Sequence, residues 1–199
     1  MVKHALSGVL RGSPARALHA RCRSACSRAS ARTVIAVPVT GVLLAVILAL
    51  GLHVNLSASA PRGLYRTVTG RPTQGTWVVA CVSPQSAALA RARGYLGSGP
   101  CAGGVQPVLK PVVAAAGDVV EIGPEAVTIN GRRLLSSSTA ASDSRGRGLP
   151  HVAWGRYVVA AGQVWLVSTR VPNSWDSRYL GPISTAQVWS VAQPVWTVD

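Results

Sequence analysis

The segment from Thr33 to Val54 constrains this chain more than any other, because it contains no Asp, Glu, Lys or Arg. A helix of about 20 apolar residues crosses a hydrocarbon core about 30 Å thick. We therefore expect a single transmembrane helix over residues 33–54. Its only titratable side chain is His53, which we expect at the membrane interface.

Positive charge is unevenly distributed along the chain. The formal net charge is +14, and residues 1–32 contain seven Lys and Arg residues but no acidic residue. Basic residues next to an apolar span usually stay in the cytoplasm. Residues 1–32 are thus predicted to be a basic cytoplasmic arm, with residues 55–199 on the other side of the membrane. A DNA-binding arm is the less favoured alternative, and no nucleic-acid partner is expected.

A secretory signal peptide is another interpretation of the N-terminal region. Ala58-Ser59-Ala60 fits the A-x-A cleavage site of such peptides. However, the basic region and the apolar run are both longer than usual. Pro61, directly after the cut, would also suit a protease site poorly, because its ring fixes φ and removes the N–H. A retained membrane anchor is therefore favoured.

The four cysteines form two pairs along the sequence. Cys22 and Cys26 lie in the basic arm and are expected to be free thiols on the reducing side. Cys81 and Cys101 lie in the exported part, where disulfides persist, so we predict a bridge between them. No group of His, Cys, Asp or Glu has the spacing of a metal site, and no metal or cofactor is predicted.

The exported part is predicted to be mostly β, because short runs rich in β-branched and aromatic residues alternate with Gly and Pro. Asn130-Gly131 is typical of a two-residue hairpin turn, residues 86–95 suggest a short helix, and residues 136–150 an exposed loop. The predicted strands are Trp77–Val82, Val119–Ile122, Ala126–Ile129, Tyr157–Val159 and Val164–Ser168.

Lysine is nearly absent from this chain. Eighteen arginines accompany two lysines, Lys3 and Lys110, and Lys110 lies among apolar residues in QPVLKPVVAAAGDVVEI. Lysine, unlike arginine, can lose its proton when it is desolvated, and a neutral amine can act as a general base. A lysine whose ammonium snorkels to solvent from a strand end explains the same pattern equally well. A histidine-based triad is less attractive, since only His53 and His151 lie outside the arm.

Three blocks of sequence can be compared with known families: NLSASAPRGLY at 55–65, VLKPVVAAAGDVVEI at 108–122 and NSWDSRYLGPI at 173–183, in this order along the chain. Together they resemble the active-site boxes of the membrane-bound serine/lysine signal peptidases. The first block is similar to the N-x-[ST]-x-S-x-P-x-G-L-Y pattern of the TraF-type branch, which matures conjugative pilin. The resemblance implies a signal-peptidase-like β domain that follows a single N-terminal transmembrane helix.

The resemblance also implies roles for individual residues. Ser59 would be the nucleophile and Lys110 the general base. Ser57, on the same side of an extended chain as Ser59, would complete an oxyanion hole with the Ser59 backbone N–H, although the two serines could exchange roles.

In the third block, Ser174 would hydrogen-bond the lysine, and Asp176 and Arg178 would form a structural ion pair. The general leader peptidases have G-D-N-R before this serine, whereas this chain has STRVPNS. Lys110 is also followed by Pro111 where they usually have arginine. These departures favour the TraF-type branch.

The function expected from the sequence is that of a serine endopeptidase in the bacterial inner membrane, with its peptidase domain, residues 55–199, in the periplasm. It would cleave a pre-pilin or another membrane-tethered precursor, and could also cyclise it. A general type I signal peptidase is one alternative. A non-catalytic anchored scaffold of a conjugative secretion channel is another.

Overall fold

The computed structural model describes residues 41–42 and 49–198. The chain divides into two units, residues 1–47 and Leu48–Asp199, and the described strands all belong to the second. The predicted basic arm, Cys22, Cys26 and most of the predicted membrane helix lie outside the described residues. Of the helices that are described, none has the length and apolar character needed to span a membrane.

The end of the predicted membrane helix differs from the structure. Leu52–Asn55 forms strand β1, which pairs antiparallel with β2 (Arg62–Val68). The prediction of helix is therefore wrong for residues 52–54. Hydropathy alone does not separate the last turn of an apolar helix from an apolar strand that follows it. The change comes at Gly51, which has φ 63° and whose carbonyl accepts a hydrogen bond from Thr67 N at 2.8 Å.

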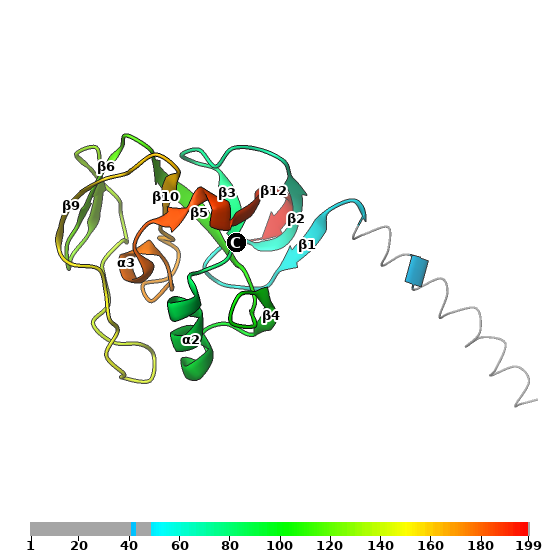
Figure 1. Ribbon diagram of the computed structural model, residues 1–199, viewed down its shortest axis with the longest axis horizontal. Helices are drawn as coiled ribbons and strands as arrows, with labels where there is room; N and C mark the ends of the chain where they lie inside the picture. The colour runs from blue at the N-terminus through cyan, green and yellow to red at the C-terminus, as the bar shows by residue number, and fades with distance from the viewer. Residues whose placement is uncertain (1–40, 43–48, 199) are drawn as a thin grey trace, which may run out of the picture. The chain divides into compact units, whose positions relative to one another are not determined.

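A seven-stranded antiparallel sheet forms the larger part of the domain (Figure 1). Its strand order is β1-β2-β12-β3-β5-β10-β11, so the last long strand of the chain lies between β2 and β3. The five strands that follow β2 in this sheet are β3 (Trp77–Ala80), β5 (Val108–Ala115), β10 (Gln163–Leu166), β11 (Ile183–Ser184) and β12 (Val188–Val198).

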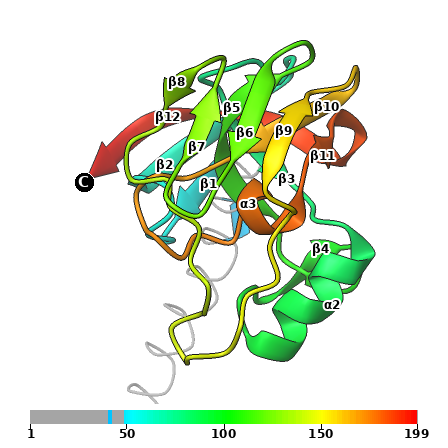
Figure 2. The ribbon, with the colours of Figure 1, turned by 90° about the vertical axis from the view of Figure 1, so that its left-hand side faces the viewer.

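A second, four-stranded sheet has the order β8-β7-β6-β9, and Figure 2 shows β7, β6 and β9 side by side. The bounds are β6 (Val119–Ile122), β7 (Val127–Ile129), β8 (Arg132–Arg133) and β9 (Gly155–Val158). Asn130 and Gly131 join β7 to β8 with φ values of 49° and 78°. Two positive φ values are what a type I′ hairpin turn requires, so the predicted hairpin is confirmed.

The prediction of a mostly β domain is confirmed, but it was incomplete. Every predicted strand overlaps an observed one, whereas the long strands β2, β5 and β12 and the short strands β1, β4 (Ser98–Cys101) and β11 were not predicted. Two of the long strands contain a proline, Pro111 in β5 and Pro194 in β12, and proline is generally unfavourable within a sheet. Pro194 is accommodated because the pairing of β12 with β2 shifts its register directly after it.

One helix and one short strand lie beside each other at the edge of the domain in both views, α2 (Pro84–Arg93) and β4 (Ser98–Cys101) (Figures 1 and 2). The predicted helix, 86–95, begins and ends two residues late. The observed start is set by Ser83, whose side chain caps the helix by accepting from Ser86 N, and by proline at the first helical position. Two further helical segments of the domain are short, α3 (Ser177–Leu180) and the 3₁₀ turn η1 (Thr185–Gln187).

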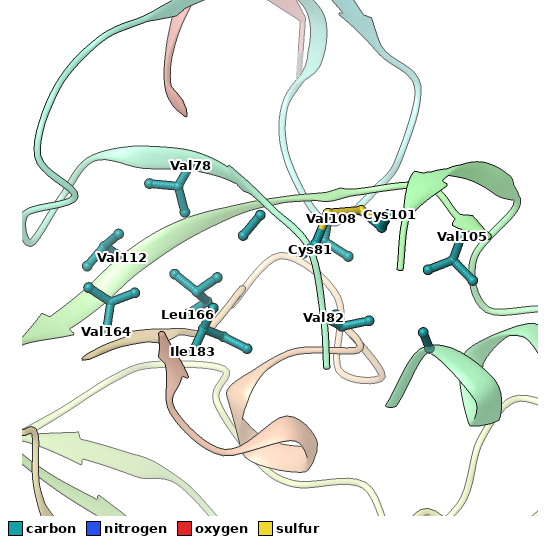
Figure 3. Close-up of a cluster of buried hydrophobic side chains, with 12 residues drawn as sticks. Val78, Cys81, Val82, Cys101, Val105, Val108, Val112, Val164, Leu166 and Ile183 are labelled. Atoms are coloured by element: carbon teal, nitrogen blue, oxygen red, sulfur yellow. A yellow bond between two sulfur atoms is a disulfide. The ribbon is translucent and has the colours of Figure 1, made fainter. Parts of the chain in front are cut away.

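Strand β10 contributes to both hydrophobic cores because successive side chains of a strand point to opposite faces. Val164 and Leu166 pack with residues of β3, β5 and β11 in the first core (Figure 3). Trp165 and Val167 belong to the second core, which lies against the small sheet. Strand β5 also contributes to both cores, with Val108 and Val112 in the first and Ala114 in the second, so β5 and β10 together tie the two sheets.

The predicted disulfide between Cys81 and Cys101 is present, with a Cα–Cα distance of 5.6 Å. It lies within the first core and joins the end of β3 to the end of β4 (Figure 3). The bridge thereby holds the α2–β4 segment against the large sheet.

We expect replacement of both bridging cysteines by alanine to lower thermal stability. The bridge closes a loop with a sequence separation of 20, for which the chain-entropy relation gives about 3 kcal/mol. For a domain of this size that corresponds to a fall in Tm of roughly 6–12 °C. Calorimetry of the full chain in detergent, with and without reductant, measures it. An unchanged Tm would contradict the structural role of the bridge.

Candidate active site

A cavity of about 700 Å³ is lined by residues of several strands of the large sheet and of the loops beside them, and its walls include Ser57, Ser59, Lys110 and Ser174. Three separate parts of the chain supply these side chains. The two serines at 57 and 59 lie in the loop between β1 and β2, Lys110 lies on β5, and Ser174 lies in the loop between β10 and α3. The fold thus brings the three blocks singled out in the sequence to one place.

Lys110 points to the buried face of its strand. Exposure alternates along β5, so that Val108, Lys110, Val112 and Ala114 are all buried. The lysine is only 5% exposed. Burial lowers its pKa from 10.5 to about 8, Asp176 opposes this shift and Arg178 adds to it. The apolar surroundings of Lys110 therefore raise the fraction of its amine that is neutral near physiological pH.

The amine of Lys110 has one defined partner. Its Nζ donates a hydrogen bond to Ser174 Oγ at 2.7 Å, and Ser174 is 3% exposed. A neutral amine has two N–H groups and one lone pair. With one N–H directed at Ser174, rotation of the amine is restricted and the lone pair is left available for a proton.

The two serines of the first block contact each other directly. Ser57 Oγ and Ser59 Oγ are 2.9 Å apart, and Ser59 N donates to Ser57 Oγ at 3.3 Å. Ser59 is 8% exposed, whereas Ser57 is exposed. The backbone N–H of Ser59 and the hydroxyl of Ser57, the two donors that the resemblance implies for an oxyanion hole, are thus hydrogen-bonded to each other.

Ser59 Oγ and Lys110 Nζ face the same cavity, but no hydrogen bond joins them in the part of the chain that the structure describes. Each is engaged by a neighbouring serine instead. In enzymes without substrate, catalytic hydrogen bonds are often long and shorten only in the complex. A substrate carbonyl that replaces Ser57 at the Ser59 N–H would also release the Ser59 hydroxyl from its present partner.

Asn55 holds the loop that carries these serines. Its Nδ2 donates to the carbonyls of Ser57, Ala60 and Pro61 at 3.0–3.3 Å, and its Oδ1 accepts from Ser57 N at 3.1 Å. Tyr65 adds a hydrogen bond from its hydroxyl to the Pro61 carbonyl at 2.8 Å. Asparagine and tyrosine at these places in the first block therefore shape the loop.

Gly63 explains another part of the first block. Its φ is 146°, and a Cβ there would lie 2.1 Å from the carbonyl oxygen of Trp196. No side chain fits between β2 and β12 at this point. The glycine thus lets β12 close against the strand that leads away from Ser59.

Asp176 and Arg178 form a fully buried ion pair. Their carboxylate oxygen and guanidinium nitrogen are 2.8 Å apart, and both side chains are 0% exposed. The carboxylate also accepts from the backbone N–H groups of Ser168 and Arg178. The guanidinium reaches the carbonyls of Ser138, Ser168, Pro172 and Ser174. The pair thus braces the loop between β10 and α3.

Ser168 was not singled out in the sequence, yet it touches the loop of the first block. Its Oγ donates to the carbonyl oxygen of Ser59 at 2.5 Å, and the residue is 1% exposed. The one sequence feature that drew attention to this region was the segment STRVPNS, which begins at Ser168 and stands where the general leader peptidases have G-D-N-R. Nothing in that segment indicates which part of the chain the hydroxyl would meet.

Residues 136–150 do form a loop, as predicted, but one anchored to the domain. The carboxylate of Asp143 accepts from Tyr95 Oη at 2.6 Å and from Arg147 Nε at 2.7 Å. The Tyr95 hydrogen bond, followed by backbone and side-chain hydrogen bonds from Arg147 and Arg145, holds the pKa of Asp143 well below its usual range. Tyr95, Asp143, Ser144 and Leu149 line the cavity, so this loop forms part of its wall.

Metal binding has no candidate ligands in the described residues, where no three His, Cys, Asp or Glu side chains cluster. The arrangement instead offers a buried hydroxyl, a desolvated amine and backbone donors around one cavity. Those groups are suited to acyl transfer.

We expect Asp176→Asn to destabilise the domain strongly, because it leaves the buried Arg178 guanidinium without its counter-charge. Breaking a buried pair in this way costs roughly 3–5 kcal/mol. The matched control is Glu125→Gln, which breaks the exposed pair with Arg133 at 4.0 Å and should cost about 0–1 kcal/mol. Denaturant unfolding of the full chain measures both, and equal costs would contradict the bracing role.

Comparison with known proteins gives related sequences over most of the chain. The plasmid transfer protein TraF of Escherichia coli is 37% identical over 151 residues, covering 75% of this chain and 84% of that protein. The conjugal transfer protein TraF of Agrobacterium tumefaciens is 41% identical over 152 residues, covering 74% and 83%. A probable conjugal transfer protein TraF of Sinorhizobium fredii is 39% identical over 150 residues, covering 74% and 78%.

A solved signal peptidase I from Enterococcus faecalis matches with a TM-score of 0.36 and 19% identity, over 62% of this chain and 98% of that one. That likeness is too low to carry an argument. The model of the family described as "Signal peptidase, peptidase S26" matches residues 27–197. This chain therefore belongs to the signal peptidase family, and its similarity to TraF transfer proteins bears out the resemblance stated from its three sequence blocks.

Proposed function

We propose that this protein is a membrane-anchored serine endopeptidase that uses Ser59 as nucleophile and Lys110 as general base to cleave a pilin precursor for conjugative transfer. The observation that carries the proposal is the shared cavity. A serine hydroxyl and a lysine whose pKa is lowered to about 8 both line it, and in the described residues no histidine contacts either group through a hydrogen bond.

The first half of the reaction forms an acyl-enzyme. Neutral Lys110 accepts the proton of Ser59 Oγ while that oxygen attacks the scissile carbonyl carbon. The developing oxyanion is stabilised by the Ser59 N–H and the Ser57 hydroxyl. Collapse of the intermediate breaks the C–N bond, and the Lys110 ammonium returns its proton to the leaving amine.

The second half releases the acyl group from Ser59. Lys110 is neutral again after the first half and can take a proton from the incoming nucleophile. Attack by water gives a linear product, and attack by an amine of the same substrate gives a cyclic one. Both routes end with the Ser59 hydroxyl restored, so the chain uses the same two residues for either outcome.

The substrate class follows from the membrane position that the sequence suggests. Ser59 comes shortly after the apolar segment 33–51. A nucleophile held near the outer face of the inner membrane meets a precursor that is tethered at the same depth, which raises its effective concentration. The names of the relatives, which refer to plasmid and conjugal transfer, support a precursor of the transfer apparatus.

We expect Ser59→Ala and Lys110→Arg to abolish processing of a pilin precursor from the same transfer system. Lys110→Arg is the sharper change, because it keeps the positive charge but forbids deprotonation. The full chain is reconstituted with the precursor in proteoliposomes, and products are identified by mass spectrometry, which also separates linear from cyclic pilin.

Matched controls for these two variants are Ser98→Ala, at an exposed position of β4, and Lys3→Arg, the chain's other lysine. Both should process the precursor normally. Turnover retained by Ser59→Ala or Lys110→Arg would remove the assigned dyad. Equal processing of a bulk secreted precursor would instead assign the chain a general signal peptidase role.

The pH dependence of processing should report the amine of Lys110. Below a pKa of about 8 the amine is protonated and cannot accept the serine proton. We therefore expect kcat/KM to rise about tenfold per pH unit up to that value and to level off above it. Initial rates between pH 6 and about pH 9.5 measure the profile. A rate that is flat across this range would contradict Lys110 as the base.

A further inference from the structure

The carbonyl oxygen of Ser59 accepts a hydrogen bond from a residue that is distant in the sequence. Ser168, 109 residues later in the chain, donates from Oγ to Ser59 O at 2.5 Å. The direction of this bond is not ambiguous, because a carbonyl oxygen can only accept. Both residues are buried, at 1% and 8% exposure, so water does not readily substitute for the hydroxyl.

Ser168 is itself held rigidly. Its backbone N–H donates to Asp176 Oδ2 at 3.0 Å, and its carbonyl accepts from Arg178 Nη2 at 3.2 Å. Its Oγ also accepts from Arg170 N at 3.4 Å. The hydroxyl that meets Ser59 is thus fixed through the buried ion pair rather than by the surface of a flexible loop.

Three consecutive carbonyls of the loop between β1 and β2, those of Ser59, Ala60 and Pro61, accept hydrogen bonds from side chains. Those of Ala60 and Pro61 accept from Asn55 Nδ2 at 3.3 Å and 3.0 Å. Asn55 lies at the end of β1, directly before this loop, whereas Ser168 lies in the loop between β10 and α3. Ser168 therefore ties the backbone of Ser59 to the part of the domain that also contacts Lys110.

The same loop also holds the lysine. Six residues after Ser168, Ser174 accepts the hydrogen bond from Lys110 Nζ at 2.7 Å. The carbonyls of Ser168 and Ser174 both accept from Arg178 Nη2. One braced loop thus contacts the backbone of the serine with one hydroxyl and the amine of the lysine with another.

We propose that Ser168 is a positioning residue that fixes the backbone of Ser59 and so sets the distance between the Ser59 hydroxyl and the Lys110 amine. This inference rests on the proposed function, in which these two groups react together. Ser168 touches neither the substrate nor the reacting atoms. Its loss should slow the chemical step and leave binding of the precursor unchanged.

The test compares Ser168→Ala and Ser168→Thr in the full chain, reconstituted with the pilin precursor. Misplacement of a reacting group by about 1 Å can cost about 10²-fold in rate, so kcat of Ser168→Ala should fall by up to about that factor with KM unchanged. Ser168→Thr keeps the hydroxyl and should recover most of kcat. Ser168→Cys, close in size but a weak donor, should be intermediate, and it carries the test where the alanine variant does not fold.

The pH dependence of kcat/KM distinguishes the role of Ser168 from that of Ser174. In Ser168→Ala the midpoint should stay at the pKa of about 8, because Lys110 keeps Ser174 as its partner. In Ser174→Ala the midpoint should fall, because a hydroxyl that accepts from an ammonium favours the charged form. A midpoint that moves equally in both variants would mean that Ser168 acts through Lys110, which overturns the inference.

Two further outcomes overturn it. One is a lowered Tm of Ser168→Ala with kcat unchanged, which is the result of a merely structural hydrogen bond. The other is a threonine variant as slow as the alanine variant. The Ser59→Ala variant, assayed in parallel, distinguishes failure of the proposed function from failure of this inference. If Ser59→Ala is active, the proposed function fails. If it is inactive while Ser168→Ala turns over normally, this inference alone fails.

Discussion

The ion pair between Asp176 and Arg178 is the interaction on which the arrangement of the cavity depends. Two opposite charges at 0% exposure are stable only when their remaining hydrogen-bonding groups are satisfied, and here backbone groups do this. The pair takes up backbone N–H groups and carbonyls of the loop between β10 and α3. That loop presents Ser168 to the backbone of Ser59 and Ser174 to the amine of Lys110.

The same pair sets the electrostatic surroundings of the lysine. Asp176 raises the pKa of Lys110 and Arg178 lowers it, so the two charges act in opposite directions. Desolvation is the largest cause of the shift, and it follows from the place of Lys110 on the buried face of β5. The braced loop can therefore lie beside the amine without holding it in its charged form. Structural bracing and a lowered pKa are compatible here because the brace is nearly neutral as a unit.

Local patterns predicted local features well. The hairpin at Asn130-Gly131 follows from turn chemistry, the short helix was predicted to within two residues at each end, and the disulfide follows from the expected compartment of its cysteines. The limits were also local. Pro111 and Pro194 concealed two long strands, because a residue that disfavours sheets can be accommodated by pairing that the sequence does not display. The apolar run beyond Gly51 concealed β1.

By itself, the sequence determined which chemistry was available: a lone lysine among apolar residues, a serine in a strict pattern, and a third block that resembles a known family. It did not determine which face of its strand Lys110 occupies, because the neighbouring residues on both faces of β5 are apolar and an exposed lysine explains the same pattern equally well. Only the tertiary structure decided what those groups meet. Ser168 lies 109 residues from the carbonyl it binds, and Tyr95 lies 48 residues from Asp143. Such contacts arise from strand order and loop closure, which no local pattern specifies.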